Sequence, residues 1–138
     1  MTEEIQTKVV IEILGKPKEH VDTTIKKYVD KILENFKVTN HVLYEAEELK
    51  DEKFKGMFSS FVDFDMNFKD FNSLVIFCFD FMPSSVEIVN PKRFDLDSEE
   101  VMSFLNDLMT KLHDLDMMVK NLSAENVLLK RELDKKEK

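Results

Sequence analysis

Residues 101–133 read VMSFLNDLMTKLHDLDMMVKNLSAENVLLKREL, and apolar side chains recur in this stretch alternately three and four positions apart. With Leu105 as heptad position a, the a positions are Leu105, Leu112, Val119, Asn126 and Leu133. The d positions are Val101, Leu108, Leu115, Leu122 and Leu129. Because a 3.5-residue apolar period makes two helices wind around each other, these ten positions predict the seam of a coiled coil.

Asn126 is the one polar residue among the ten seam positions. A buried asparagine at a single a position favours a parallel, in-register dimer, because only there does it meet its own counterpart. Glu125 at position g and Lys130 at the following e position are spaced to form an ion pair between the two chains. An antiparallel or intramolecular arrangement, and pairing with a different protein, are the alternatives.

The order Val119, Leu122, Asn126, Leu129, Leu133 resembles the leucine zippers of eukaryotic bZIP transcription factors. The resemblance covers about 20 residues and implies pairing only. Those proteins carry a basic DNA-reading helix immediately upstream, whereas this chain has acidic residues there: Asp107, Asp114 and Asp116. DNA binding is therefore not part of what the resemblance implies.

The residues before the heptads predict an α+β domain. Apolar periodicity and turn residues indicate, in chain order, a strand at 5–14, a helix at 17–35, strands at 38–49 and 54–66 around a charged turn at 50–53, a helix at 71–82 and a strand at 86–89. The segment 71–82 is ambiguous, because its β-branched and aromatic residues suit a strand as well. A helix there completes a β-α-β-β-α-β order, which is the ferredoxin-like arrangement with both helices on one face of a four-stranded antiparallel sheet.

We therefore expect two parts in the chain. Residues 1–96 form the ferredoxin-like domain, and residues 97–138 form a long helix beginning near Ser98. Met102, Phe104 and Met109 widen the apolar stripe in the first half of this helix, which predicts that this half docks on the domain. The second half should continue as a parallel dimeric coiled coil.

Composition limits the classes of function. The net charge of -8 disfavours binding to phosphate backbones, so nucleic acid is not an expected partner. The longest uninterrupted apolar run, residues 74–79, is too short to cross a bilayer, and the first residues lack the features of a signal peptide. Cys78 is the single cysteine and permits no intrachain disulfide. These features predict an acidic cytoplasmic protein without membrane partners.

No group of residues has the spacing of a catalytic or metal site. His20, His41 and His113 fall in three different elements, so we expect no enzyme activity, no cofactor and no metal. A weak candidate anion site is formed by Lys16 and Lys18 after the first strand. Two further candidate surfaces are apolar: Met57 and Phe61 on the open face of the sheet, and Val127 with Leu128 outside the helical seam.

Two segments resemble a group of small archaeal proteins without an assigned function: residues 11–21, IEILGKPKEHV, and residues 77–89, FCFDFMPSSVEIV. This resemblance implies no activity for any residue. The leading hypothesis is a non-enzymatic homodimeric scaffold or adaptor that assembles through its C-terminal coiled coil. The alternative is a small-molecule sensor similar to the amino-acid-binding ACT domains, which share the β-α-β-β-α-β order, with its ligand at the dimer interface.

Overall fold

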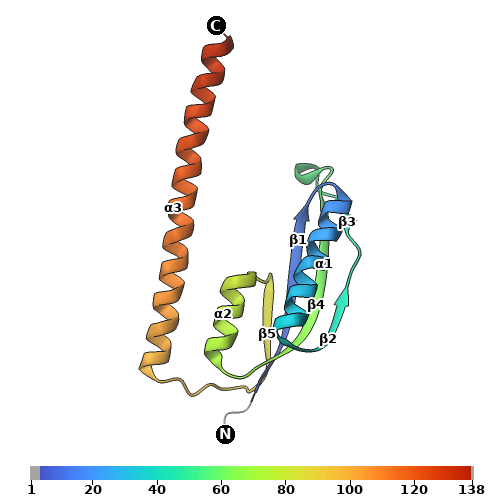
Figure 1. The fold of residues 1–138 in the computed structure, drawn as a ribbon, viewed down its shortest axis with the longest axis vertical. Coiled ribbons are helices and arrows are strands. Elements are labelled where there is room, and N and C mark those ends of the chain that lie inside the picture. Colours follow the sequence, from blue (N-terminus) through green and yellow to red (C-terminus); the bar gives the residue numbers. More distant parts are fainter. Residues whose placement is uncertain (1–3, 138) are drawn as a thin grey trace. The chain divides into compact units, whose positions relative to one another are not determined.

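The structure is a computed structural model that describes residues 4–137 and consists of two compact units, divided between Asp95 and Leu96. The first unit contains β1 (Ile5–Gly15), α1 (Lys18–Asn35), β2 (Lys37–Leu43), β3 (Glu47–Glu48), a 3-10 turn (Glu52–Phe54), β4 (Phe58–Phe68), α2 (Phe71–Phe81) and β5 (Ser85–Asn90) (Figure 1). The second unit is built on one long helix, α3 (Ser98–Glu137). The fold class is α+β, as the sequence predicts.

The five strands form one antiparallel sheet in the order β2-β4-β1-β5, and the short β3 pairs with β4. The centre of the sheet is the β1/β4 pair, which runs without interruption from Ile5 opposite Phe68 to Gly15 opposite Phe58. The period of two in β1 places Ile5, Val9 and Ile11 on one face, and all three are buried. That face is the floor of the hydrophobic core.

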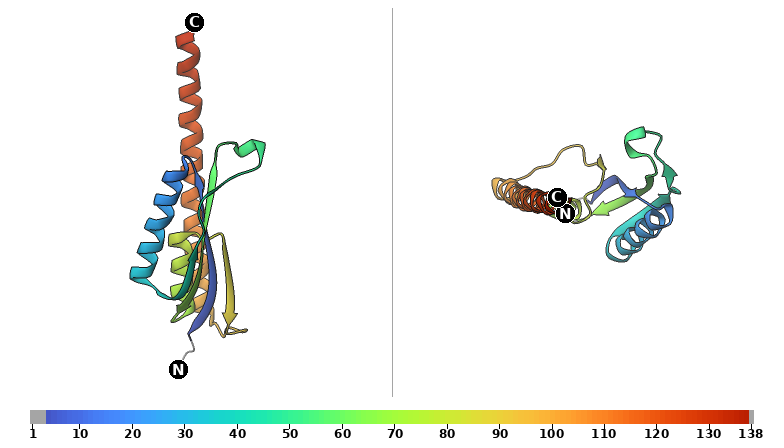
Figure 2. Two further views of the ribbon diagram at one scale, coloured as in Figure 1. Left: turned by 90° about the vertical axis from the view of Figure 1, so that its right-hand side faces the viewer. Right: turned by 90° about the horizontal axis from the view of Figure 1, so that it is seen from above.

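Both shorter helices cover this same face of the sheet. The left view of Figure 2 shows α1 and α2 on one side of the strands. On α1 the buried side chains are Val21, Ile25, Val29 and Ile32, which form a stripe at helical spacing. Leu74 and Phe77 of α2 join the same core cluster as Phe64 and Met66 of β4. The core therefore lies between the sheet and the two helices.

The ambiguous segment is a helix, as topology predicts. Its N-terminus is capped by Asp70, whose carboxylate accepts a hydrogen bond from the Ser73 backbone N–H at 2.8 Å. The Ser73 hydrogen bonds lower the pKa of Asp70. The helix ends at Met82, which has a left-handed φ of 45° and directly precedes Pro83. Sequence signals at both ends thus fix this element.

The prediction of one strand over 38–49 is wrong, because the chain leaves the sheet between β2 and β3. The Tyr44 carbonyl accepts a hydrogen bond from the Ser60 hydroxyl at 2.7 Å, and the Ala46 N–H donates to the Asp22 carboxylate at 3.2 Å. These side chains come from β4 and α1, and they satisfy backbone groups that a continuous strand would have paired. The sheet consequently has five strands instead of the expected four.

Two element boundaries also differ from the prediction. The strand predicted from residue 54 begins at Phe58, because Phe54 lies in the 3-10 turn and is exposed. At the start of α3 the capping hydrogen bond is made by Asp97, whose carboxylate accepts from the Glu100 N–H at 2.9 Å. Ser98 is therefore the first residue of the helix, and Asp97 caps it.

Candidate functional site

The predicted seam of α3 is an exposed row of large apolar side chains in the second unit. The helix has 40 residues, and none of its described side chains is buried. The exposed seam residues include Leu105, Leu112, Val119, Leu122, Leu129 and Leu133, while Leu108 and Leu115 are half-buried. An exposed row of large apolar side chains is costly in water. The seam is therefore a candidate surface for association.

A groove opens along this seam around Asn126. Its volume is about 450 Å³, and it is lined by Val119, Leu122, Ser123, Glu125, Asn126 and Leu129. Asn126 lies between two apolar seam residues, Leu122 and Leu129, and its amide can both donate and accept hydrogen bonds. The groove thus combines apolar walls with one polar group that needs a polar counterpart when it is buried.

The charged residues beside the seam are available for contacts with another chain. Glu125 and Lys130 form no ion pair in the described residues 4–137. Asp116 differs, because its carboxylate lies 2.8 Å from the Lys120 ammonium one turn later in the same helix. Val127 and Leu128 are exposed and lie outside the seam. Their predicted role as a second contact surface stays a prediction.

The open face of the sheet holds only one of the two predicted apolar residues within a strand. Phe61 lies on β4 opposite Glu12 and is 40% exposed. Met57 precedes β4, where its carbonyl accepts a hydrogen bond from the Leu49 N–H, and it is partly buried. Asp63 and Asp65 share this face with Phe61, so its centre is acidic. Two such faces packed together would bring like charges close to each other.

The candidate anion site after β1 already contains a carboxylate. The Lys18 ammonium lies 2.7 Å from Glu45, a residue between β2 and β3. Their hydrogen bond raises the pKa of Lys18 and lowers the pKa of Glu45. An incoming anion would have to compete with Glu45 for Lys18. Of the two lysines predicted to form this site, Lys18 therefore already has a counter-charge.

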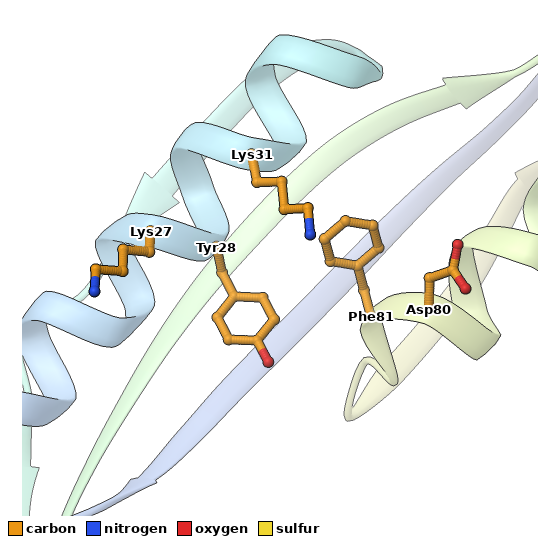
Figure 3. Close-up of a pocket in the computed structure, with 5 residues that line it drawn as sticks. All are labelled: Lys27, Tyr28, Lys31, Asp80 and Phe81. Carbon is orange, nitrogen blue, oxygen red and sulfur yellow. The ribbon is translucent and has the colours of Figure 1, made fainter.

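A second groove, which the sequence alone did not reveal, lies between α1 and α2. Its volume is about 500 Å³, and it is lined by Lys27, Tyr28, Lys31, Asp80 and Phe81. Figure 3 shows the ammonium of Lys31 directed at the Phe81 ring, with Tyr28 beside it. The groove joins residues about fifty positions apart in the chain. Periodicity in the sequence predicts that these residues lie on helices. It does not predict that α1 and α2 lie next to each other.

The remaining reactive groups form no constellation in the part of the chain that the structure describes. No group of three or more His, Cys, Asp or Glu side chains in residues 4–137 is arranged to hold a metal ion. Cys78 is half-buried, and burial raises the pKa of its thiol, which disfavours the reactive thiolate. Within the same residues, no helix has both the length and the apolar character needed to span a bilayer.

Comparison with known families places the chain. The model of the MJ0538 family matches residues 6–138, nearly the whole length. The chain belongs to the MJ0538 family. The match includes the sheet, all three helices and the seam of α3, and it is consistent with the resemblance to small archaeal proteins. No curated protein and no solved structure matches the chain.

Membership of the MJ0538 family supplies no activity by itself, since its description names no ligand, reaction or partner. Two surfaces of this member are candidates for function: the seam groove around Asn126 and the groove between α1 and α2.

Proposed function

We propose that this protein is a non-enzymatic scaffold that assembles as a parallel homodimer through α3. The observation that carries the proposal is the set of residues lining the groove around Asn126. In a parallel coiled coil each seam side chain inserts into a hole made by four residues of the facing helix. The residues of the groove form two such holes.

The first hole suits a leucine. Leu122 of a second copy would pack among Val119, Leu122, Ser123 and Asn126 of the first. The second hole suits the asparagine, because Asn126 of the second copy would pack among Leu122, Glu125, Asn126 and Leu129. Together these two holes use all six residues that line the groove and no others. The two Asn126 amides would then be able to hydrogen-bond each other.

Charge along the flanks supports the same arrangement. In a parallel dimer Glu125 faces Lys130 of the second copy, and neither residue forms an ion pair within the described chain. Such exposed pairs contribute little energy, about 0.2–1 kcal/mol each, but they favour one register over others. Lys111 at position g and Asp116 at the following e position have the same spacing, but their pair would be weaker, because Asp116 already contacts Lys120.

The first unit supports a scaffold built on a ferredoxin-like domain. The order β2-β4-β1-β5 with every neighbouring pair antiparallel, and with two helices over one face, agrees with the split β-α-β arrangement. The short β3 is then an addition to β4. We place the assembly in the cytoplasm, since an unpaired, half-buried cysteine suits a reducing compartment.

Light scattering over a concentration series tests the assembly. We expect a mass of twice the 16.3 kDa chain at micromolar concentration. A monomer at that concentration would refute the proposal. Orientation is tested by oxidising a Leu133→Cys variant in a Cys78→Ser background, because residue 133 meets its own counterpart only in the parallel register. Val127→Cys, at an outward position of the same helix, is the matched control and should cross-link poorly.

A further inference from the structure

We infer that the groove between α1 and α2 binds a nucleoside monophosphate, or a small aromatic phosphate of the same size. The groove belongs to the first unit, so this inference goes beyond the proposed scaffold role and does not depend on it. Its volume of about 500 Å³ lies in the range of small-molecule sites, which is about 300–1,000 Å³. Two properties of its lining suit such a ligand: a fixed aromatic wall and two neighbouring lysines.

The aromatic wall is held rigidly from behind. Phe81 stacks on the fully buried Phe77 with ring centroids 5.1 Å apart, and Phe36 meets Phe81 edge-on at 5.5 Å. Tyr28 closes the other side, with its ring 6.3 Å from Phe81 and nearly perpendicular to it. A ring held in this way loses little freedom when a ligand packs against it. The wall therefore suits a flat aromatic group.

Two lysines stand on the α1 side of the groove. Lys27 and Lys31 are one helical turn apart, so their side chains are neighbours, and like charges at this spacing repel each other. Neither ammonium forms an ion pair in the described part of the chain. Lys31 instead lies over the Phe81 ring, 5.9 Å from its centroid. Most basic side chains in the described residues lack an ion pair, but Lys27 and Lys31 line one groove, where a single phosphate could contact both and relieve their repulsion.

Asp80 lies on the α2 side of the groove. Figure 3 shows its carboxylate directed away from the lysines and from the Phe81 ring, so the space between them holds no competing carboxylate. A ligand for this space needs a phosphate for the two lysines and a flat ring for Phe81, and a nucleoside monophosphate carries both groups. The Lys31 ammonium can move off the Phe81 ring when a ligand binds, because the contact between an exposed lysine and a ring is weak.

A polymer of nucleotides fits less well than a single one. A third hollow, on the open face of the sheet, has four glutamates in its lining, Glu12, Glu45, Glu47 and Glu48, against one basic residue, Lys50. Together with the net charge of -8, this face would repel an extended phosphate backbone. A single nucleotide in the groove between the helices needs to contact only Lys27 and Lys31.

Equilibrium dialysis of the full chain with AMP, adenosine and inorganic phosphate tests the inference. We expect AMP to bind at least tenfold more tightly than adenosine or phosphate, because only AMP uses both the wall and the lysines. Equal binding of phosphate and AMP would mean that the lysines attract any anion, and would overturn the inference. Absence of AMP binding at millimolar concentration would overturn it too.

Variants locate the binding. Lys27→Met and Lys31→Met should each weaken AMP binding at least tenfold, while Lys26→Met, its neighbour on α1 outside the groove, should change it less than twofold. An equal effect of Lys26→Met would refute the site. Phe81→Leu should bring AMP binding down to the level of phosphate, and a thermal melt of each variant confirms that it is folded. Light scattering reports dimer formation separately, so failure of this inference leaves the scaffold proposal untouched.

Discussion

Replacing Leu122 by alanine should weaken the proposed dimer, whereas the same change at Leu128 should not. Both leucines are on α3 and are almost equally exposed, 61% and 58%. They differ only in heptad position, because Leu122 is a seam residue and Leu128 faces outward. In a single chain the two substitutions are therefore nearly equivalent. Any difference between their effects on dissociation of the dimer reports how much the seam position contributes to association.

The size of the effect follows from the exposed fraction. Burying a whole leucine side chain contributes about 1.5–3 kcal/mol, so covering 61% of Leu122 contributes about 1–2 kcal/mol per chain. Two chains give about 2–4 kcal/mol per dimer, which corresponds to a rise of about 30- to 700-fold in the dissociation constant. Leu128→Ala should change the constant by less than about threefold, the scale of an ordinary surface substitution.

Sedimentation equilibrium of the full chain at several loading concentrations measures both constants. Circular dichroism at the same concentrations checks that α3 remains helical in each variant. The reasoning is refuted if both variants dissociate to the same extent, or if Leu122→Ala sediments like the unmodified protein. In either case the exposed row on α3 would not be a dimer seam.

Three further predictions concern stability. Phe77→Ala should lower the free energy of unfolding in urea by about 3–5 kcal/mol, because Phe77 is fully buried. Ile76→Ala on the same helix should lower it by less than about 1 kcal/mol, because Ile76 is 47% exposed. Similar losses for the two variants would contradict the packing of α2. Asp70→Ala should cost about 1 kcal/mol at pH 7 through loss of the cap. Since the pKa of Asp70 is lowered by folding, its stabilisation is complete above the ordinary value of 3.8 and is lost as the pH falls through the lower folded value. Asp70→Asn should not show this acid loss in melts between pH 2 and 7, and an unchanged acid profile would count against the cap. Asn126→Val should raise the thermal midpoint while loosening the choice between dimer and trimer, and an unchanged midpoint would argue against a buried asparagine pair.

Helical and strand periodicity predicted most elements because those signals are local. The strand from Ile5 and the helix ending at Asn35 follow from residues within a few positions of one another. The helix after Asp70 needed the order of the whole domain as well, because its own residues suit a strand equally. The dimer seam could be predicted in the same way, since a heptad pattern is complete within one helix, but its pairing is still a proposal.

The break between β2 and β3 could not be predicted, because its cause lies in other elements. Val42, Tyr44 and Ala46 alternate like a strand, but the Asp22 carboxylate on α1 and the Ser60 hydroxyl on β4 bind the backbone there. Glu45 meets Lys18 for the same reason, as the loop is drawn toward the start of α1. Hydrogen bonds between distant residues therefore decided this segment.

The sequence by itself predicted most of the helices and strands and the heptad pattern along α3, because periodicity and capping act over one or two turns. Only the tertiary structure decided the strand order, the side chains that fill the core and the groove joining Lys31 to Phe81. These depend on packing between segments far apart in the chain. Such contacts form only when the sheet brings α1 and α2 onto one face. A local pattern in the sequence cannot show which residues of the two helices will meet.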